Sequence, residues 1–350
     1  TQSRSSAASD VYKRQEWMRS NPSDRCILLG TKSGLEMSLV PAAGFELFTI
    51  ARVRISRKPS ASWLRVPIDL FSSVISSIKV VKKADLLIGF GGYVSAPAYL
   101  AAALTRTPIV IHEANAKPGW ANRLGARFTS HLAVAHPVED GCFSGALLAG
   151  LPLRTDVAQG VIESVADWGK ARSLAKKRLG FSEAAPLVVV MGGSQGSVAI
   201  NAVIADCVST FNGQGVSVLH SVGKLNALPQ DIGGYRAVPY IEAMADAYLA
   251  ADLIIARSGA VTCSEFRALG RYALFVPLPI GNGEQLVNAA SLVEAGRAEV
   301  IAQRDFTAQF ITNNLTALLE RSSAAPVAGD SHDLHAAAKI VALAEFAMNS

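Results

Sequence analysis

The stretch ADLIIARSGAVTCSEFRALGRYALFVPLPIGNGEQ, residues Ala251 to Gln285, predicts a strand, a tight turn, a helix and a second strand. Its apolar run, Leu253 to Ala256, is typical of a buried strand and ends at Arg257-Ser258-Gly259. The helix expected to follow carries Thr262 and, three residues later, Glu265. Because open α/β sheets bind nucleotides where a strand turns into a helix N-terminus, this stretch predicts a nucleotide site.

An earlier stretch, Ala84 to Ile111, repeats the same order of elements in the sequence ADLLIGFGGYVSAPAYLAAALTRTPIVI. The matching positions are Asp85 with Asp252, Gly92 with Gly259, and Ser95 with Thr262. Two copies of one βαβ unit predict an α/β protein with two similar domains.

The composition is that of a folded protein with buried parallel sheets. The chain has 350 residues, of which 50% are hydrophobic and 17% charged, and these values exclude a disordered or fibrous class. The net charge of +5 is not gathered into long Lys/Arg blocks, so nucleic acid is not predicted as a partner. An anionic membrane surface or a phosphate-bearing substrate fits this charge. No apolar run reaches the ~18 residues of a spanning helix, and no signal peptide is recognisable.

The cysteines predict neither a metal site nor a disulfide framework. Cys26, Cys142, Cys207 and Cys263 lie far apart, with no CxxC pair and no His at ligand spacing. The simplest interpretation is a reduced, cytoplasmic setting.

One helix of the N-terminal half has two interpretations. Five apolar residues, Leu64, Ile68, Phe71, Ile75 and Ile78, recur at helical spacing among many Arg and Lys residues. Pro67 indicates that the helix begins at or just before it. The helix either packs on the sheet or, together with Trp63, forms an exposed apolar patch with a basic rim that rests on anionic lipid.

Two further loops follow predicted strands. Leu187 to Met191 leads into the Gly-rich run Gly192 to Gly196, where backbone N–H groups and a helix N-terminus can face a phosphate, although such turns also occur for packing. Ile109 to Ile111 leads into His112-Glu113-Ala114-Asn115, and polar residues just past a strand end point into the ligand crevice. A lone His at such a place is as often structural as chemical.

Five segments together resemble the MurG family. They are GFGGYVSAPA (Gly89 to Ala98), HEANAKPGWANR (His112 to Arg123), GGSQG (Gly192 to Gly196), RSGAVTCSE (Arg257 to Glu265) and GNGEQLVNA (Gly281 to Ala289). Members of that family are peripheral membrane glycosyltransferases that move N-acetylglucosamine from UDP-GlcNAc onto the muramoyl-pentapeptide diphospho-undecaprenol lipid of peptidoglycan synthesis. The resemblance runs in order and spacing from Glu16 to the C-terminus.

This resemblance implies the GT-B fold, two Rossmann-like doubly wound domains facing a cleft, at the cytoplasmic face of the cell membrane. It implies that the C-terminal domain binds the donor, that the N-terminal domain binds the lipid acceptor, and that the transfer is inverting and needs no cofactor. The expected segments are a tail (1–15, disordered or an assembly scar), an N-terminal domain (16–153), a C-terminal domain (154–333) and a final helix (334–350) with the N-terminal domain as its candidate packing partner.

The resemblance also implies roles for single residues. Glu265 should bind the ribose diol, Ser194 the diphosphate, and Arg154 should lie beside the phosphates. Gln285 and Asn115 should reach the sugar, and the backbone of Ile241 the uracil. The other expected donor contacts are Gln195, Ala260, Val261, Thr262, Cys263 and Ser264, with Gly92, Gly193, Arg257, Glu284 and Asn288 as further candidates. Three of these have structural alternatives. Glu265 can close a capping box with Thr262, Arg257 can pair with a surface acid, and Glu284 can be a solvated side chain.

One family feature has no counterpart. The family's first Gly-rich loop, a Thr-Gly-Gly-His-type run that carries the proposed catalytic His, is not found, and the resemblance therefore implies an N-terminally incomplete sequence. His112 and Glu113 are the remaining candidates for a catalytic base. Two alternatives stay open: a UDP-GlcNAc-binding protein with little or no turnover, and a GT-B enzyme that acts on another lipid.

Overall fold

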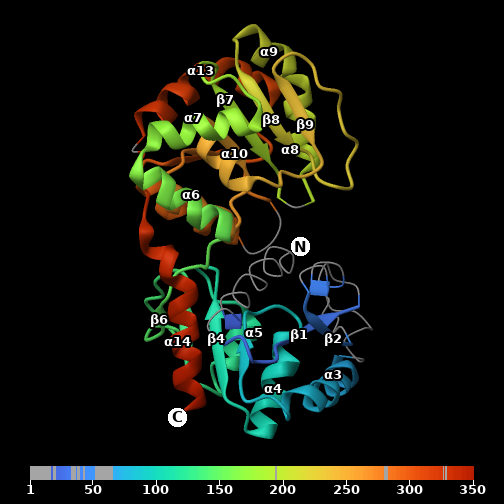
Figure 1. Cartoon of the computed structure of the whole chain (residues 1–350). Coiled ribbons are helices and arrows are strands. Elements are labelled where there is room, and N and C mark those ends of the chain that lie inside the picture. Colours follow the sequence, from blue (N-terminus) through green and yellow to red (C-terminus); the bar gives the residue numbers. More distant parts are fainter. Residues whose placement is uncertain are drawn as a thin grey trace. The chain divides into compact units, whose positions relative to one another are not determined.

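The computed structural model describes residues 17–18, 21–32, 37, 40–41, 44–51, 66–193, 195–279, 283–325, 327 and 329–350. The expected tail, residues 1–15, and Trp63 lie outside them. The chain divides into two compact units, of which unit 1 is Thr1–Pro152 with His335–Ser350 and unit 2 is Leu153–Leu334 (Figure 1). The C-terminal segment thus belongs to the N-terminal unit, and both boundaries lie one residue from those expected.

Unit 2 is built on a six-stranded sheet in which all pairings are parallel. Its strands are β7 (Leu187–Met191), β8 (Ser217–Ser221), β9 (Tyr235–Val238), β10 (Leu253–Ala256), β11 (Ala273–Phe275) and β12 (Ala298–Val300). Their order is β12-β11-β10-β7-β8-β9, so the chain reverses its direction of progress between the adjacent strands β7 and β10. In such sheets the ligand crevice lies beyond the carboxyl ends of the two strands at the reversal.

Helices cover both faces of this sheet, which confirms the predicted doubly wound fold. Leu187 and Val189 of β7 belong to one core, whereas Val188 and Val190 belong to the other, as the two-residue period of a strand requires. Helices of the first core are α6 (Thr155–Ala166), α7 (Trp168–Leu179), α10 (Met244–Ala250), α11 (Ala260–Leu269) and α12 (Glu284–Glu294). Helices of the second core are α8 (Val198–Asp206), α9 (Val208–Gly213) and α13 (Ala308–Ala324). Figure 1 shows α7 and α10 side by side on the near face of the strands.

Unit 1 contains two parallel sheets within the described residues. The pair β1 (Ile27–Thr31) and β2 (Glu46–Ile50) forms one, and the other has the order β3 (Leu87–Gly89), β4 (Ile109–Glu113), β5 (Leu132–Val134) and β6 (Leu147–Leu148). Ile109 and Ile111 of β4 pack toward α3 (Val66–Val81) and α4 (Ser95–Thr105), while Val110 packs toward α14 (Ala336–Met348). A short helix, α5 (Trp120–Gly125), follows β4.

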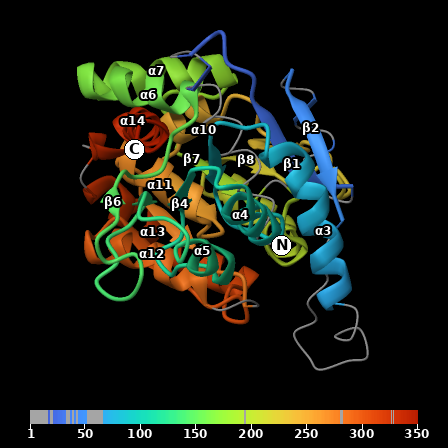
Figure 2. The same ribbon diagram turned by 90° about the horizontal axis from the view of Figure 1, so that it is seen from below.

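Helix α3 begins at Val66, as the position of Pro67 predicts, and lies beside α4 in Figures 1 and 2. It packs inward through Val74 and Val81, which belong to the same core as α4. Of the predicted stripe, Ile68, Phe71 and Ile75 lie on the other side and are exposed to 69%, 70% and 45%. Ile78 packs against the core, and Leu64 lies outside the described residues. The packing interpretation is therefore wrong for the three exposed residues, although it is right for the helix as a whole.

Candidate functional site

The Gly-rich turn of unit 2 follows β7 and interlocks with the turn that follows β8. A Cβ added at Gly196 (φ +70°) would lie 1.8 Å from the Val222 carbonyl oxygen, and one at Gly223 (φ +96°) would lie 2.2 Å from the Gln195 carbonyl oxygen. The Asn226 amide, Nδ2, donates to both of these carbonyls, at 2.7 and 2.8 Å. Only glycine fits at these contacts, because any side chain there would clash with backbone.

Gly193 differs from its neighbours in the same turn. Its φ is +91°, and a Cβ built on it would meet no atom within 4 Å. Ser194 lies outside the described residues, and Gln195, the other expected contact here, is half-buried. The backbone at Gly193 is thus the open side of the turn, at the carboxyl end of β7 and in front of α8.

The start of α8 is tied to the end of β10 by Arg257. The Ser197 hydroxyl caps α8 by accepting from the Ile200 amide, and it also accepts from Arg257 Nη2 at 2.7 Å. Arg257 Nη1 donates to the carbonyls of Val276 and Pro277, at 2.7 and 3.0 Å. The alternative of a surface ion pair is therefore wrong, because this guanidinium is 9% exposed and bonded to carbonyls and hydroxyls.

Glu265 lies fully buried on α11, between Arg154, which precedes α6, and Tyr248 of α10. Its Oε2 accepts from the Tyr248 hydroxyl at 2.7 Å, and its Oε1 lies 2.9 Å from Arg154 Nε. Burial raises the pKa of the Glu265 carboxyl, against the Arg154 charge and the Tyr248 hydrogen bond, which both lower it. Helix α11 begins at Ala260 after Gly259, so Thr262 is inside the helix and the capping-box alternative is wrong.

The remaining candidates on α11 differ in how deeply they are buried. Cys263 lies in the core, where burial raises the pKa of its thiol to about 12, and Ser264 donates to Asp333 Oδ2 at 2.5 Å. Val261 and Thr262 are half-buried, and Ala260 is buried at the helix start. Ile241 is also a core residue, so only its backbone remains for the expected uracil contact.

The first turns of α12 bring three candidates close to β10 and β11. Gln285 Oε1 accepts from the Leu278 amide at 2.9 Å, and Asn288 Nδ2 donates to the Ser258 carbonyl at 3.3 Å. Glu284 occupies the first position of the helix, where a negative charge is favourable. The Asn288 Oδ1 and Ser258 Oγ atoms are buried and accept or donate no hydrogen bond within the described part of the chain. These polar atoms lie next to the reversal between β7 and β10.

The corresponding loop of unit 1 is closed on itself by Glu113. Its Oε1 accepts from the backbone amide and the side chain of Asn115, at 2.9 and 3.0 Å. Its Oε2 accepts from the Gly119 amide and from Asn122 Nδ2, at 2.8 and 2.9 Å. Four donors occupy the lone pairs of this carboxylate, which is 2% exposed, so the side chain holds the loop together.

His112 and Gly92 complete the unit 1 candidates. His112 is fully buried, and its Nε2 lies 2.8 Å from the Gly150 carbonyl, so this nitrogen carries the proton. Gly92 has a φ of +86° with open space around it, as Gly193 has in unit 2. The histidine therefore links β4 to Gly150, near the end of the first segment of unit 1.

The sequence reasoning missed the partners of the expected site residues. Tyr248 stands in an Ala-rich helix, Tyr240 accepts from Arg154 Nη1 at 3.4 Å, and Asn226 lies in a polar loop. None of them belongs to a motif. Only the pairing of elements distant in sequence shows what these three side chains do.

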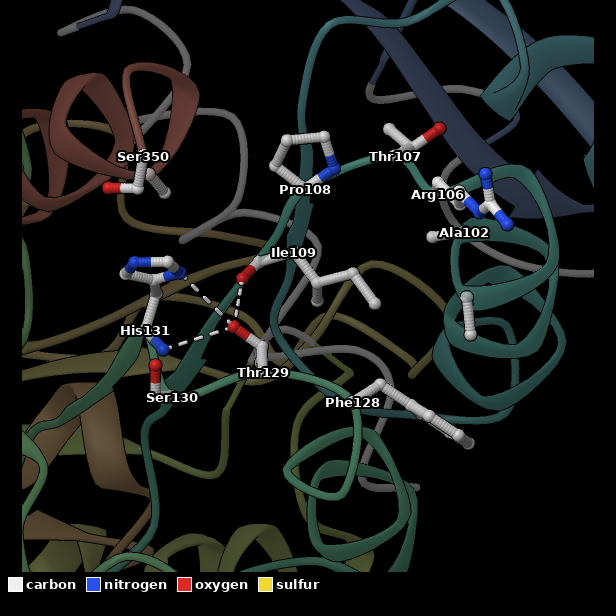
Figure 3. A pocket seen from close by; sticks show the side chains of 12 residues that line it. Ala102, Arg106, Thr107, Pro108, Ile109, Phe128, Thr129, Ser130, His131 and Ser350 are labelled. Atoms are coloured by element: carbon white, nitrogen blue, oxygen red, sulfur yellow. Dashed lines mark hydrogen bonds between the residues drawn. The ribbon is translucent and has the colours of Figure 1, made fainter.

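A pocket of about 540 Å³ in unit 1 lies at the opposite, amino ends of β4 and β5 (Figure 3). Figure 3 shows Thr129 at its centre, where the hydroxyl donates to the Ile109 carbonyl at 2.6 Å and accepts from the His131 amide at 3.0 Å. This pocket is at the wrong edge of the sheet for the nucleotide, and its central hydroxyl is already engaged.

The described residues show neither a metal site nor a membrane-spanning helix. They contain no group of three or more His, Cys, Asp or Glu side chains arranged to hold a metal ion. None of their helices combines the length and the apolar character needed to cross a membrane.

Comparisons with known proteins agree with this geometry. Residues 21–134 match the glycosyltransferase family 28 N-terminal domain, and residues 187–343 match the family 28 C-terminal domain. UDP-N-acetylglucosamine–N-acetylmuramyl-(pentapeptide) pyrophosphoryl-undecaprenol N-acetylglucosamine transferases are similar to this chain. The protein of Paenarthrobacter aurescens (strain TC1) is 43% identical over 306 residues, covering 85% of this chain and 80% of that protein. The protein of Thermobifida fusca (strain YX) is 43% identical over 311 residues, covering 86% and 79%.

Solved structures show the same fold. The crystal structure of Acinetobacter baumannii MurG has a TM-score of 0.69 and 24% identity, covering 97% of this chain and 96% of that one. The UDP-GlcNAc 2-epimerase of Neisseria meningitidis, bound to UDP-GlcNAc, has a TM-score of 0.57 and 12% identity, covering 97% and 96%. The predicted GT-B fold is confirmed.

Proposed function

The chain belongs to the MurG family within glycosyltransferase family 28, and on that premise we propose that it transfers N-acetylglucosamine from UDP-N-acetylglucosamine to N-acetylmuramyl-(pentapeptide) pyrophosphoryl-undecaprenol. It is a glycosyltransferase with the GT-B fold. The reaction joins an acceptor hydroxyl oxygen to the anomeric carbon of the sugar and breaks the bond from that carbon to the diphosphate oxygen. The hydroxyl gives up its proton to the solvent or a base, and UDP leaves. Direct attack inverts the anomeric carbon and needs no covalent intermediate on the enzyme.

The observation that carries this proposal is the buried carboxylate beside the β7–β10 reversal. Glu265 Oε1 accepts no hydrogen bond from the described residues, although the atom is fully buried. A carboxylate oxygen in that state can accept from a ribose hydroxyl with a charge-assisted bond. The open turn at Gly193 and the start of α8 lie at the same edge of the sheet and offer backbone donors to a diphosphate.

The roles of the other candidates follow from their positions in unit 2. Ser194 and Gln195 would donate to the diphosphate, whose negative charge grows as the sugar departs, and each such donor is worth ~10²- to 10³-fold in rate. Gln285 and Asn288 on α12 would contact the sugar, and the backbone of Ile241 the uracil. The expected contact of Asn115 with the sugar stays a prediction, and the amide nitrogen of this side chain donates to Glu113 within unit 1.

A transfer assay with the purified chain tests the function. UDP-GlcNAc and the lipid-linked muramoyl pentapeptide should give a product that carries one added N-acetylglucosamine, whereas diacylglycerol should give none. Donor binding without any transfer would support the alternative of a binding protein with little turnover. Transfer to diacylglycerol and none to the muramoyl lipid would support a glycosyltransferase for another lipid.

We also propose that unit 1 rests on the cytoplasmic face of the cell membrane through α3. Ile68, Phe71 and Ile75 stand on one side of that helix with large exposed fractions. Lys79, Lys82 and Lys83 follow in its last turn and just after it, and basic side chains beside apolar ones favour anionic lipid surfaces. The acceptor carries an undecaprenol chain, so a membrane-bound enzyme would meet it where it resides.

Substitution of the α3 stripe tests this contact. The double variant Ile68→Glu with Phe71→Glu should lose at least ~10-fold in binding to vesicles of anionic lipid, since both apolar burial and charge attraction fall. A matched control is Ile162→Glu with Val165→Glu on α6, whose side chains are exposed to 56% and 74%. Equal loss in both double variants, or no loss in the α3 variant, would rule out α3 as the contact.

A further inference from the structure

Arg154 and Tyr248 hold the two oxygens of Glu265 in different ways. The Tyr248 hydroxyl donates to Oε2 at 2.7 Å, and burial keeps that phenol a donor by raising its pKa well above the usual value. Arg154 Nε lies 2.9 Å from Oε1, yet Oε1 accepts no hydrogen bond of acceptable angle from the described residues. Oε2 is therefore held by a hydrogen bond, whereas Oε1 is covered by the Arg154 guanidinium without a well-directed hydrogen bond.

The Arg154 side chain also lies toward the Gly-rich turn. Its Nη1 donates to the Tyr240 hydroxyl at 3.4 Å, and Lys224 Nζ lies 5.3 Å from the centre of the Tyr240 ring. Lys224 follows Gly223, the residue that packs on the backbone of the Gly-rich turn. The guanidinium is thus placed between the carboxylate of Glu265 and the loops at which we place the diphosphate.

From this geometry we infer that Arg154 makes ribose recognition conditional on the phosphates of a nucleoside diphosphate. When the diphosphate binds at the turn, the guanidinium leaves Glu265 Oε1 and pairs with a phosphate oxygen. The ribose hydroxyls then take its place on Oε1, while Tyr248 keeps Oε2 in position. The exchange is electrostatically favourable, because the guanidinium moves from the Glu265 carboxylate to the diphosphate, which carries more negative charge. The neutral ribose diol then donates hydrogen bonds to the carboxylate.

This inference rests on the proposed donor site, and it gives Arg154 a role in specificity that its place beside the phosphates does not by itself imply. A nucleoside without phosphates cannot draw the guanidinium away from Glu265 Oε1. Its ribose hydroxyls should therefore add nothing to its binding affinity. Tyr248 is a positioning residue in this scheme, since it acts on the ribose only through Glu265.

Calorimetric titration of the full chain with four ligands tests the exchange. UDP should bind about 10-fold more tightly than 2′-deoxy-UDP, whereas uridine and 2′-deoxyuridine should bind equally. In Arg154→Met, uridine should gain a several-fold preference over 2′-deoxyuridine, because Oε1 is no longer covered. Arg172→Met is the matched control: it loses a different Arg–carboxylate pair of unit 2, with Asp252 at 2.5 Å, and should keep the wild-type pattern.

Two results would overturn the inference. One is a preference of the wild-type protein for uridine over 2′-deoxyuridine as large as that for UDP over 2′-deoxy-UDP. The other is an Arg154→Met protein that melts as the wild type does and still binds the two nucleosides equally. If Arg154→Met does not fold, Tyr248→Phe decides the question, because it should shrink the UDP preference while changing affinity for 2′-deoxy-UDP less than two-fold. Since the readout is nucleotide binding, a failure of transfer to the muramoyl lipid would leave this result unaffected.

Discussion

The two units each bury a glutamate next to the carboxyl end of their sheet, and the two side chains are used differently. Glu113 of unit 1 accepts four hydrogen bonds from its own loop and from Asn122 on α5. Glu265 of unit 2 accepts one, from Tyr248, and faces Arg154 with its other oxygen. The first carboxylate is saturated by donors that belong to the fold, while the second retains an oxygen for a ligand.

This difference shows that burial alone does not identify a functional carboxylate. Both glutamates are almost inaccessible, at 2% and 0% exposure, and both stand in motifs of the family. What separates them is the number of donors that the fold supplies, because a carboxylate has about four lone-pair sites and an unused one is costly to bury. A comparison of partners therefore assigns Glu113 to the loop and supports the proposal that Glu265 binds the donor nucleotide.

The largest expected difference between the two carboxylates is the effect of removing Glu113 on stability. Glu113→Ala should destabilise unit 1 by ~4 kcal/mol, given ~1.5–3 kcal/mol for each hydrogen bond to a charged group and incomplete additivity. Glu265→Ala should instead weaken UDP binding by ~1–3 kcal/mol, and it should cost unit 2 a further ~1–3 kcal/mol of stability because the buried Tyr248 hydroxyl loses its acceptor. Urea unfolding followed by hydrogen exchange in each unit, together with UDP titration, measures both. If Glu113→Ala weakens UDP binding, or if Glu265→Ala leaves UDP binding unchanged, the assignment of the two carboxylates is wrong.

A slightly smaller difference in stability is expected between the Gly-containing turns of the two units. Gly196→Ala should cost ~3 kcal/mol, because the methyl group would collide with the Val222 carbonyl and the residue keeps a left-handed φ. Gly92→Ala in unit 1 has the same kind of φ but open space, so it should cost only ~1–2 kcal/mol. Thermal unfolding of the two variants compares them directly. Equal costs would mean that the β7 and β8 turns do not interlock as described.

A third effect belongs to unit 2 and depends on pH. His220 is fully buried between Tyr235 and Asn201, and burial lowers its pKa from 6.5 to about 4. A lowered pKa means that the neutral ring stabilises the fold above pH 6.5 and that this stability is lost as the pH falls toward 4. The loss should be ~2 kcal/mol at pH 4, after a discount for relaxation around the charged ring.

Unfolding of unit 2 at pH 7 and at pH 4.5 measures this dependence, with hydrogen exchange in β7 and β8 as the local probe. The His220→Gln variant is the control, because it removes the titrating ring and should lose less stability over the same interval. A wild-type protein as stable at pH 4.5 as at pH 7 would contradict the assignment of a neutral buried ring.

Much of the fold was predictable because its signals are local. The strand at Leu253 to Ala256, the turn after it and the start of α3 near Pro67 follow from apolar runs, glycine and proline, which act on their neighbours in the chain. Periodicity did not predict which face of α3 is buried, because both faces carry apolar residues at helical spacing. The exposed face has Ile68, Phe71 and Ile75, and the buried face has Val74 and Val81. Which stripe is buried depends on what α4 and the sheet offer to it.

The sequence by itself determined the two α/β domains, the family and the positions of the Gly-containing turns, because short motifs specify these features. Only the tertiary structure decided which buried carboxylate remains open to a ligand. Glu265 meets Tyr248, 17 residues away, and Arg154, which precedes it by more than one hundred residues. Hydrogen-bond partners that come from separate helices leave no pattern in the sequence, since each helix is selected for its own packing and only the fold brings their polar atoms together.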